Sequence, residues 1–265
     1  MASRSTPDSG IVETFKTIFW ALIIAGLFRT LLFQPFFIPS ESMKETLLIG
    51  DFMFVNKMAY GYSRYSCPFA ICPIPGRLQL PLVSGEPQRG DVVVFRHPVS
   101  GQDYIKRLTG LPGDKMQMKQ GVLFINDVAA PQDPAGTFTE IYEPQGAQGH
   151  SPKCENAPVG LGGDCTRSRF IETLPNGTTH AVLNSEKGPG DNTDVFTVPL
   201  GKYFFMGDNR DNSLDSRFGQ SIGGVGFVPY DNLIGRADRV LFSSAGSSLF
   251  YVWTWRMDRF FKAIE

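Results

Sequence analysis

A long apolar segment close to the N-terminus constrains this chain more than any other feature. Residues 18–27 carry no charge, and the apolar run resumes over residues 31–33. A helix needs about 20 residues to cross a bilayer, so residues 15–34 are long enough if Lys16 and Arg29 reach toward the headgroups. The sequence therefore predicts a transmembrane anchor over residues 15–34.

Two other origins of this segment stay open from sequence. A cleaved signal peptide requires small residues after its apolar core, and the bulky residues Phe28, Arg29 and Leu31 disfavour it. A buried helix of a soluble domain would end equally well before Pro35. The basic residues around the start of the span lean weakly toward a short cytoplasmic tail over residues 1–14.

The composition favours a folded, β-rich protein that does not bind nucleic acid. The 265 residues are enough for one large domain or two small ones, and 42% of them are hydrophobic. The formal net charge of -1 gives no electrostatic basis for nucleic acid binding. Glycine and proline are abundant, at 28 and 19 residues, which is typical of turn-rich β structure.

Short apolar strands separated by turn residues predict an all-β fold after the anchor. The expected strands are residues 52–57, 91–96, 103–108, 121–127, 202–206 and 239–242. No helical periodicity is sustained between Pro35 and Leu249. We expect a large, irregular, barrel-like antiparallel sheet built from residues 35–115 and 200–248.

The middle of the chain and its C-terminus differ in texture from these strands. Residues 129–198 are rich in Gly, Pro, Asn, Asp and Thr, so we interpret residues 116–199 as a smaller β-domain inserted into the first. Residues 249–265 mix aromatic and basic side chains, which is typical of a contact with a membrane surface. A terminal helix packed on the sheet accounts for the C-terminal pattern equally well.

The four cysteines form two pairs that are local in sequence, Cys67 with Cys72 and Cys154 with Cys165. An even number in local pairs suits an oxidising compartment, so we predict two disulfides that each close a short loop. The alternative is four unrelated free thiols. No cluster of metal-ligating residues is evident in the sequence, so neither a metal nor another cofactor is expected.

Three segments carry candidate chemistry. They are residues 38–43, with the sequence IPSESM, residues 103–107, DYIKR, and residues 207–217, GDNRDNSLDSR. The first segment places two serines on a proline-stiffened turn just after the predicted anchor. A serine is a weak nucleophile until a base takes its proton, so the chain must supply such a base if either serine reacts.

A lysine is a better candidate for this base than a histidine. The three histidines are His97, His150 and His180. None of them lies in a motif typical of a Ser/His/Asp triad. A lysine can serve if its pKa falls about two units below its ordinary value of about 10.4, and burial lowers it. On the predicted strand, Tyr104 and Leu108 share the face of Lys106, which favours burial, although a solvated lysine at a strand edge is the alternative.

Taken together, the three segments resemble the type I signal peptidases, which are serine peptidases with a Ser/Lys dyad. The resemblance covers roughly residues 34–114 and 200–240. It implies an endopeptidase in which Ser42 is the nucleophile and Lys106 is the general base. It also implies an oxyanion hole made by the Ser40 hydroxyl and the Ser42 backbone N–H, because two donors must converge on the developing charge.

The same resemblance assigns supporting roles around the dyad. Ser213 would hydrogen-bond the lysine and orient it, and Asp215 and Arg217 would form an ion pair beside it. The remaining support residues are Arg107, Asp208 and Arg210. A calcium loop is the alternative use of these aspartates, but their spacing lacks the regular alternation and terminal glutamate of such a loop.

The chain departs from the family pattern at two positions. The pattern has glycine where this chain has Glu41, and proline where it has Glu45. A carboxylate beside the dyad would favour the protonated lysine, which opposes the mechanism. We therefore expect either that Glu41 faces solvent or that the pKa of Lys106 is higher than is usual in the family.

The resemblance also implies a substrate and a location. An extended peptide would add to an exposed sheet edge, with alternate side chains in shallow pockets that accept the alanines of Ala-x-Ala sites. These pockets would be lined by Ile38, Pro39, Met43, Leu47, Tyr104 and Ile105. The expected partners are precursor proteins with signal peptides and the phospholipid membrane, with the secretion translocon as a further candidate. The expected location is the bacterial inner membrane, crossed once, with the catalytic domain on the periplasmic side.

Two other functions are alternatives. A self-cleaving repressor-type enzyme also uses a serine and a lysine, but it requires a DNA-binding domain where this chain has its apolar segment. An anchored β-domain that binds peptides without cleaving them is the alternative outside enzymes. The intact pair of Ser42 and Lys106 argues against such a scaffold.

Overall fold

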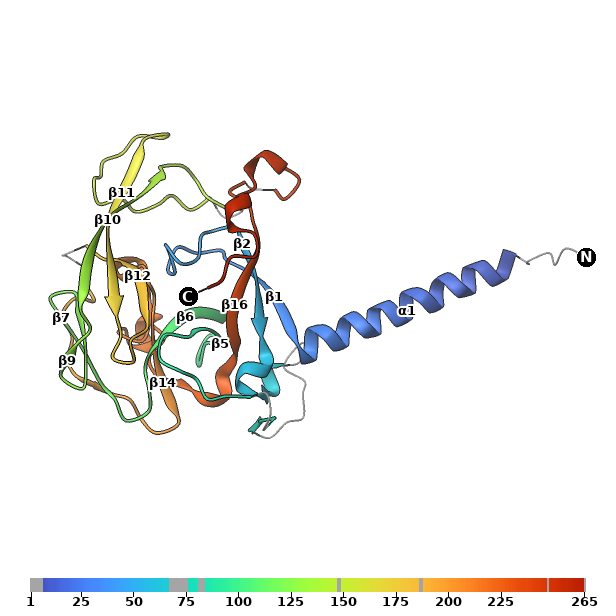
Figure 1. Cartoon of the computed structure of the whole chain (residues 1–265), viewed down its shortest axis with the longest axis horizontal. Helices are drawn as coiled ribbons and strands as arrows, with labels where there is room; N and C mark the ends of the chain where they lie inside the picture. The colour runs from blue at the N-terminus through green and yellow to red at the C-terminus, as the bar shows by residue number, and fades with distance from the viewer. Residues whose placement is uncertain are drawn as a thin grey trace, which may run out of the picture.

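A long helix, α1 (Pro7–Leu31), projects from a β-rich body in the computed structural model of the chain (Figure 1). The structure describes residues 7–66, 76–80, 84–146, 149–185, 188–246 and 248–264. The stretch Gly10–Leu31 is long and apolar enough to cross a membrane, and none of its apolar window is buried inside the protein. This exposure makes the alternative of a buried core helix wrong.

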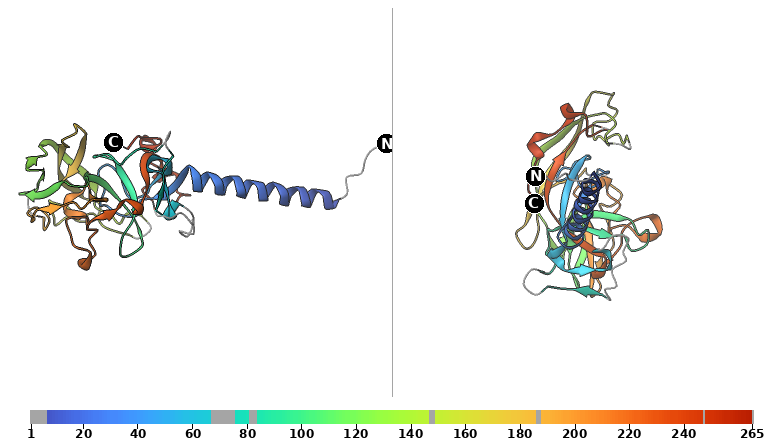
Figure 2. Two further views of the ribbon diagram at one scale, coloured as in Figure 1. Left: turned by 90° about the horizontal axis from the view of Figure 1, so that it is seen from below. Right: turned by 90° about the vertical axis from the view of Figure 1, so that its right-hand side faces the viewer.

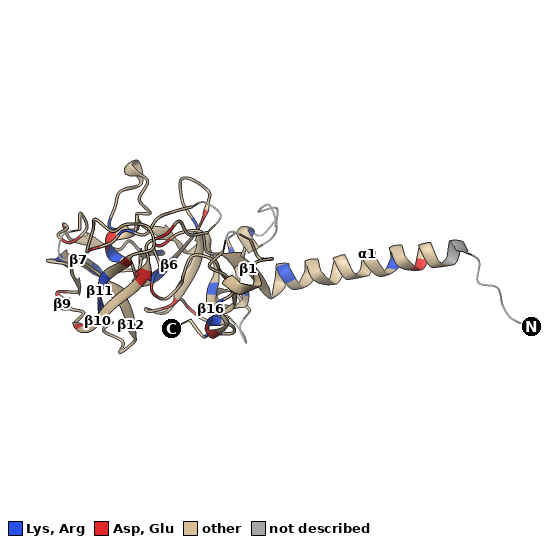
Figure 3. Cartoon of the chain, turned by 90° about the horizontal axis from the view of Figure 1, so that it is seen from above, with Lys and Arg blue, Asp and Glu red and all other residues tan. Residues whose placement is uncertain are grey.

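The bounds of α1 differ from the predicted span of residues 15–34. The helix begins at Pro7 and ends at Leu31, because residues from Phe33 onward pair with a neighbouring strand. Its charged residues stand near its two ends (Figure 3). Perpendicular views show α1 running along the long axis of the molecule, away from the sheets (Figure 2). The helix is therefore a projecting element, which contacts the body only near its C-terminal end, where the Phe28 ring lies 6.0 Å from the Phe33 ring among the described contacts.

The body is built on a seven-stranded sheet in which every neighbouring pair is antiparallel. In spatial order its strands are β1 (Phe33–Phe37), β2 (Asp51–Asn56), β16 (Leu233–Ser243), β5 (Val92–Arg96), β6 (Asp103–Gly110), β14 (Lys202–Met206) and β15 (Val228–Pro229). The strand predicted over residues 239–242 extends back to Leu233. The all-β prediction is confirmed, with an irregular, curled antiparallel sheet behind an N-terminal apolar helix.

Three smaller sheets complete the described structure. A four-stranded sheet has the spatial order β13 (Phe196–Thr197), β7 (Lys115–Lys119), β8 (Val122–Ile125) and β9 (Val128–Ala129). A three-stranded sheet has the order β10 (Gln132–Ile141), β11 (Asp164–Thr173) and β12 (Thr179–Leu183). A two-stranded sheet pairs β3 (Tyr62–Ser63) with β4 (Arg77–Leu78). The strands β7 to β12 lie at the end of the body away from α1 (Figure 1). Short 3-10 helices span Lys57–Tyr60, Arg64–Ser66, Arg210–Asn212, Gln220–Ile222, Tyr230–Asn232, Val252–Thr254 and Met257–Arg259.

The apolar core runs from the β1–β2 loop into the region of the predicted insertion. Met43 and Leu47 of that loop pack in one buried cluster with Val55 of β2. Met206 of β14 packs in another buried cluster with Leu123 of β8. The large sheet and the four-stranded sheet therefore share a core, and the division into two domains at residue 116 stays a prediction.

The C-terminal segment contains 3-10 turns where a terminal helix was the alternative. Arg259 is buried and forms an ion pair with Asp51, with Nη2 and Oδ2 2.5 Å apart. Trp255 packs edge-on against Phe242 of β16. Beside these anchored residues, several large apolar side chains are exposed: Leu249, Phe250, Tyr251, Val252, Trp253, Met257 and Phe261. The segment is thus fixed to the sheet by some side chains and presents others to the surroundings.

We predict that Gly235→Ala destabilises the protein while Gly160→Ala does not. A Cβ at Gly235 would lie 2.4 Å from the backbone oxygen of Asn56, where β16 pairs with β2, whereas nothing lies within 4 Å of a Cβ at Gly160. Overpacking of this kind costs about 1–3 kcal/mol. Thermal unfolding of the full-length chain in detergent measures the difference. Equal unfolding temperatures for both variants would show that the space beside Gly235 is not limiting.

Candidate active site

Ser42 lies in the loop between β1 and β2, where hydrogen bonds at the base of the loop and contacts from Asn209 hold it in place. Backbone hydrogen bonds between Ile38 and Asp51 and between Gly50 and Ile38 close the base of this loop. The backbone N–H of Asn209 donates to the Ser42 carbonyl at 3.1 Å, and its side-chain amide donates to the Glu41 carbonyl at 3.1 Å. The loop that follows β14 therefore holds the Ser42 backbone in place.

Lys106 reaches Ser42 from the middle of β6. Its Nζ donates to Ser42 Oγ at 2.5 Å and to the Ile105 carbonyl at 2.9 Å. Its side chain is buried, with 4% of the residue exposed, and Nζ lies 5.6 Å from the centroid of the Tyr104 ring. The sequence segments around residues 38–43 and 103–107 thus meet in a direct contact between their serine and their lysine.

Burial makes the charged form of this lysine less favourable. Loss of solvation lowers the pKa of Lys106 to about 8, against the opposing pull of the Asp215 and Asp208 carboxylates. A substantial neutral fraction therefore exists near pH 8, which an exposed lysine would reach only about two units higher. The neutral amine can accept the proton of the hydroxyl that it already contacts.

Each aspartate near the lysine has its own arginine. Arg107 makes a two-pronged contact with Asp208, with Nε and Nη2 each 2.8 Å from a carboxylate oxygen. Arg217 does the same to Asp215, with both distances 2.9 Å. Burial alone would raise the pKa of each carboxyl group, but the paired arginine and hydrogen bonds lower it. Both carboxylates therefore stay ionised. The positive charge of the paired arginine partly cancels the field of each carboxylate at Lys106.

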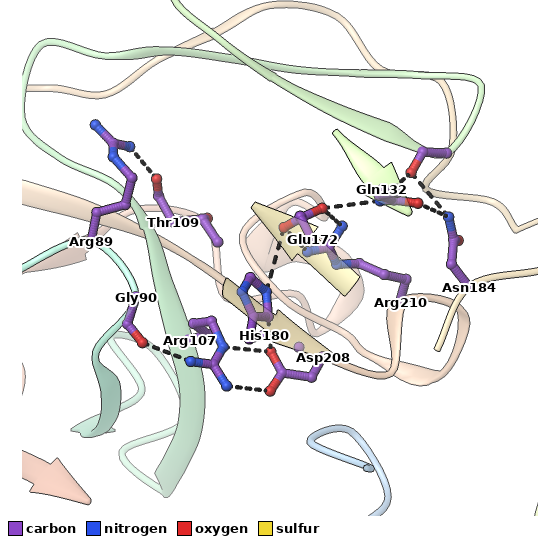
Figure 4. Close-up of polar contacts among 12 residues, drawn as sticks. Arg89, Gly90, Arg107, Thr109, Gln132, Glu172, His180, Asn184, Asp208 and Arg210 are labelled. Carbon is purple, nitrogen blue, oxygen red and sulfur yellow. Dashed lines mark hydrogen bonds and ion pairs between the residues drawn. The ribbon is translucent and has the colours of Figure 1, made fainter. Parts of the chain in front are cut away.

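The contact between Arg107 and Asp208 belongs to a larger buried polar network (Figure 4). The His180 Nε2 lies 3.4 Å from Glu172 and 3.9 Å from Asp208, while Arg210 forms a close ion pair with Glu172. Burial and then the charge of Arg107 lower the pKa of His180 to about 4, so this histidine is neutral at pH 7. His180 is thus part of the buried polar network that supports the loop after β14, which contains Asp208.

The other histidines also make contacts elsewhere. The His97 ring contacts the Gly224 carbonyl at 3.2 Å and accepts the backbone N–H groups of Val99 and Ser100. His150 pairs through its backbone with Gln145. The histidine contacts that are described lie away from Ser42, in agreement with the expectation that a lysine serves it.

Ser213 does not make the hydrogen bond that the resemblance predicts. Its Oγ is buried and has no hydrogen-bond partner within the described part of the chain, because Lys106 Nζ is directed to Ser42 and Ile105. A Cβ at Gly207 would lie 2.3 Å from Ser213 Oγ and 2.5 Å from the Ser42 carbonyl oxygen. Only a glycine at 207 therefore allows the loop to bring Ser213 this close to Ser42.

A cleft of about 660 Å³ opens over the dyad. Its lining includes Ile38, Pro39, Ser40, Ser42, Tyr104, Ile105, Lys106 and Ser213. Met43 and Leu47 do not line it, because both are fully buried and pack in the core behind the loop. The prediction that these two residues line the substrate pockets is wrong, and they instead support the wall from behind.

The two departures from the family pattern are both paired with arginines of β11. Facing solvent was one of the two expected alternatives for Glu41, and it is wrong, because Glu41 is buried and contacts Arg167 Nη1 at 3.4 Å. Glu45 contacts Arg169 Nε at 2.6 Å. Sequence reasoning missed these arginines because they lie in the region without a recognisable motif. Their spacing of two residues on a strand, which puts both side chains on one face, was the available signal.

The aspartates of residues 207–217 are occupied by protein partners, which argues against the calcium alternative. Asp208 and Asp215 each hold an arginine, and Asp211 accepts from the backbone and hydroxyl of Ser185. In the described ranges, no group of three or more His, Cys, Asp or Glu side chains is placed to hold a metal ion.

A disulfide joins Cys154 to Cys165 and so fixes the loop before β11 to that strand, with their Cα atoms 5.0 Å apart. Cys165 is the first residue after Asp164, where β11 begins. The predicted bridge between Cys67 and Cys72 lies outside the described residues.

Comparison with known proteins identifies the family. A family model described as "Signal peptidase, peptidase S26" matches residues 11–242. The chain is 40% identical over 249 residues to a signal peptidase I of Rickettsia akari, covering 88% of this chain and 81% of that protein. The chain belongs to the S26 family of signal peptidases. A signal peptidase I of Rickettsia canadensis is 37% identical over 254 residues, covering 91% of this chain and 84% of that protein.

A solved structure is also similar to part of the chain. The crystal structure of a signal peptidase I from Enterococcus faecalis is 25% identical, with a TM-score of 0.28, and the match covers 57% of this chain and 97% of that one. Family membership makes this chain a serine peptidase, a hydrolase of the class that cleaves signal peptides.

The state of Lys106 sets an expected pH profile. The kcat/KM for a peptide substrate should rise with pH and level off above about pH 8, because only the neutral Lys106 amine can take the Ser42 proton. Below this pKa the neutral fraction falls about tenfold per pH unit. Initial rates measured from about pH 5 to about pH 10 give the profile, with thermal unfolding at each pH as the check that the enzyme stays folded.

The same series repeated in EDTA is the control, and the curve should not change. A rise centred near pH 6–7, where free histidine titrates at about 6.5, would contradict the lysine base. Loss of activity in EDTA would contradict a reaction carried by protein side chains alone.

Proposed function

We propose that this signal peptidase is a membrane-anchored endopeptidase that cleaves precursor proteins at Ala-x-Ala sites with a Ser42/Lys106 dyad. The observation that carries the proposal is the buried contact of 2.5 Å between Lys106 Nζ and Ser42 Oγ. The lowered pKa of Lys106 supports it, because a lysine with an ordinary pKa would be protonated at neutral pH. Neither cofactor nor metal takes part in the proposed reaction.

The first half of the reaction forms an acyl-enzyme. Neutral Lys106 takes the proton of the Ser42 hydroxyl as Oγ attacks the scissile carbonyl carbon. The carbonyl oxygen becomes an oxyanion, which the Ser40 hydroxyl and the Ser42 backbone N–H stabilise. The tetrahedral intermediate then collapses, and the protonated Lys106 gives its proton to the leaving amine of the mature protein.

The second half releases the signal peptide. A water molecule takes the place of the departed amine, and neutral Lys106 accepts a proton from it as its oxygen attacks the ester carbonyl. Collapse of the second tetrahedral intermediate returns that proton to Ser42 Oγ. The enzyme is regenerated, and the signal peptide leaves with a free carboxylate.

The shape of the cleft supports recognition of an extended peptide with small side chains. Its lining includes Ile38 and Pro39 from the chain just before Ser42, and Tyr104 and Ile105 from the strand that carries Lys106. An extended chain in this cleft can hydrogen-bond through its main chain and place alternate side chains against apolar surface. Since bulky residues already occupy the walls, alanine-sized side chains fit the proposal best.

The position of α1 supports a location at the membrane. Its apolar surface is exposed, and only β1 and a short turn separate its end from Ser42. The exposed aromatic side chains of the C-terminal segment, such as Phe250 and Trp253, support a second contact with phospholipid. The disulfide between Cys154 and Cys165 supports an oxidising compartment. We therefore place the catalytic body on the periplasmic face of the bacterial inner membrane, where precursors leave the translocon.

We predict that Ser42→Ala and Lys106→Ala each reduce kcat for an Ala-x-Ala precursor by at least about 1,000-fold. The double variant should be no slower than either single variant, because the two side chains act as one unit. Cleavage of a purified precursor by the full-length enzyme, followed by gel electrophoresis and mass spectrometry, measures these rates.

Lys202→Ala is the matched control, because Lys202 is an exposed lysine at the start of β14. This variant should keep the activity of the unmodified enzyme. Undiminished turnover by Lys106→Ala would overturn the dyad, and cleavage at sites without small residues would overturn the proposed specificity.

A further inference from the structure

The charged residues next to Ser42 all contact side chains of the region formed by β10 and β11. Glu41, Lys44 and Glu45 lie on the nucleophile loop, and each has a partner of opposite charge from that region. Lys44 and Glu41 are 1% and 6% exposed, so these contacts form inside the protein. A charge that is buried this deeply destabilises the folded state unless a charge of opposite sign compensates it. The loop that carries Ser42 therefore depends on these partners for its stability.

The buried part of this contact is a group of four charges. Glu41 Oε2 lies 3.4 Å from Arg167 Nη1, and Lys44 Nζ lies 2.7 Å from Glu140 Oε2. Arg167 also contacts Glu140 directly, and so links the two pairs. Asn212 adds a hydrogen bond of 3.0 Å to Glu41 Oε2. Two acidic and two basic side chains cancel, and the group as a whole is neutral.

The strands β10 and β11, which carry the partners of the loop, are held together close to Glu140 and Arg167. Glu140 of β10 pairs in register with Cys165 of β11, and Cys165 carries the disulfide to Cys154. Arg167 is two residues further along the same strand. The partners of the nucleophile loop therefore stand on a covalently braced piece of sheet, which suits a positioning role.

Arg167 follows a rule that the rest of the site already obeys. Arg107 neutralises Asp208, and Arg217 neutralises Asp215, the two carboxylates whose charge acts on Lys106. Glu41 is a further buried carboxylate, directly next to Ser42 in the chain. The other charged residues of the cleft are Asp103, Lys153 and Asp211.

We infer that Arg167 is a positioning residue for the nucleophile, which it serves by neutralising Glu41 and holding the loop so that Ser42 stays against Lys106. The inference rests on the proposed dyad. Without Arg167, an excess negative charge remains buried beside the dyad and favours protonated Lys106. Without Glu41, the excess charge is positive and favours the neutral amine. The two single substitutions therefore act on the same titration in opposite directions.

The test compares Arg167→Met, Glu41→Gln and the double variant in the full-length enzyme. Methionine keeps an unbranched side chain without the charge, and glutamine keeps the shape of glutamate. Arg236→Met is the matched control, since Arg236 forms an ion pair with Asp238 on β16, away from the nucleophile loop. The measurements are kcat and KM for an Ala-x-Ala peptide across the pH range, with thermal unfolding of each variant.

We expect Arg167→Met to move the rise of kcat/KM to higher pH by about one unit, which is about a tenfold loss at pH 7. Glu41→Gln should move it to lower pH. The double variant should return the midpoint to that of the unmodified enzyme, with kcat within about threefold, because contacting residues couple. The effect should fall on kcat more than on KM, and Arg236→Met should leave the profile unchanged.

An unshifted profile in Arg167→Met overturns the inference. So does a loss that is equal at every pH and is not relieved by Glu41→Gln, because that is the behaviour of a residue needed only for folding. If Arg167→Met does not fold, Glu41→Gln decides alone, and a midpoint that stays or rises overturns the inference. Activity that survives Ser42→Ala would instead refute the dyad itself, which keeps the two failures distinct.

Discussion

The reaction that we propose for this protein depends on one buried hydrogen bond, between Lys106 Nζ and Ser42 Oγ. A lysine can act as a base only if its ammonium form is made unfavourable, and burial does this. Burial works only if nearby carboxylates do not restore the ammonium form. Asp208, Asp215 and Glu41 are all buried near the dyad, and each is held by an arginine. The arginines thus offset carboxylate charge that would otherwise favour the ammonium form of Lys106.

The backbone delivers the two members of the dyad from elements far apart in sequence. Lys106 comes from the middle of a paired strand, where Val93 of β5 lies opposite it and β14 pairs with the residues that follow it. Ser42 comes from a loop, which is intrinsically freer, and so needs several anchors. Met43 anchors it to the core, and Asn209 anchors its carbonyl. Gly207 allows the closest approach of the loop that carries Asn209. The precision of the contact is therefore set by packing around Ser42.

The sequence predicts much of this arrangement, and its failures have a common cause. Alternating apolar residues and turn signals predict the strands, because they are local properties. The motifs around Ser42 and Lys106 predict the dyad. The environment of Glu41 could not be predicted, because its partner Arg167 lies 126 residues further along the chain. The burial of Met43 and the direction of Ser213 could not be predicted either, because they depend on how the strands and loops around Ser42 pack in three dimensions. From sequence alone, a charged residue such as Glu41 is expected to face solvent, because the strand that covers it in the folded protein is not known.

The region without a recognisable motif thereby becomes part of the site. Viewed as an insertion, β10 and β11 carry a disulfide and lie away from α1, which suggests a structural appendage (Figure 1). Their inner face, however, supplies Glu140, Arg167 and Arg169 to the nucleophile loop. A glutamate at position 41 would oppose a lysine base in a protein that lacked these arginines. In this chain the departure at 41 and the arginine at 167 make physical sense only together, so the covering strand and the nucleophile loop form one electrostatic unit.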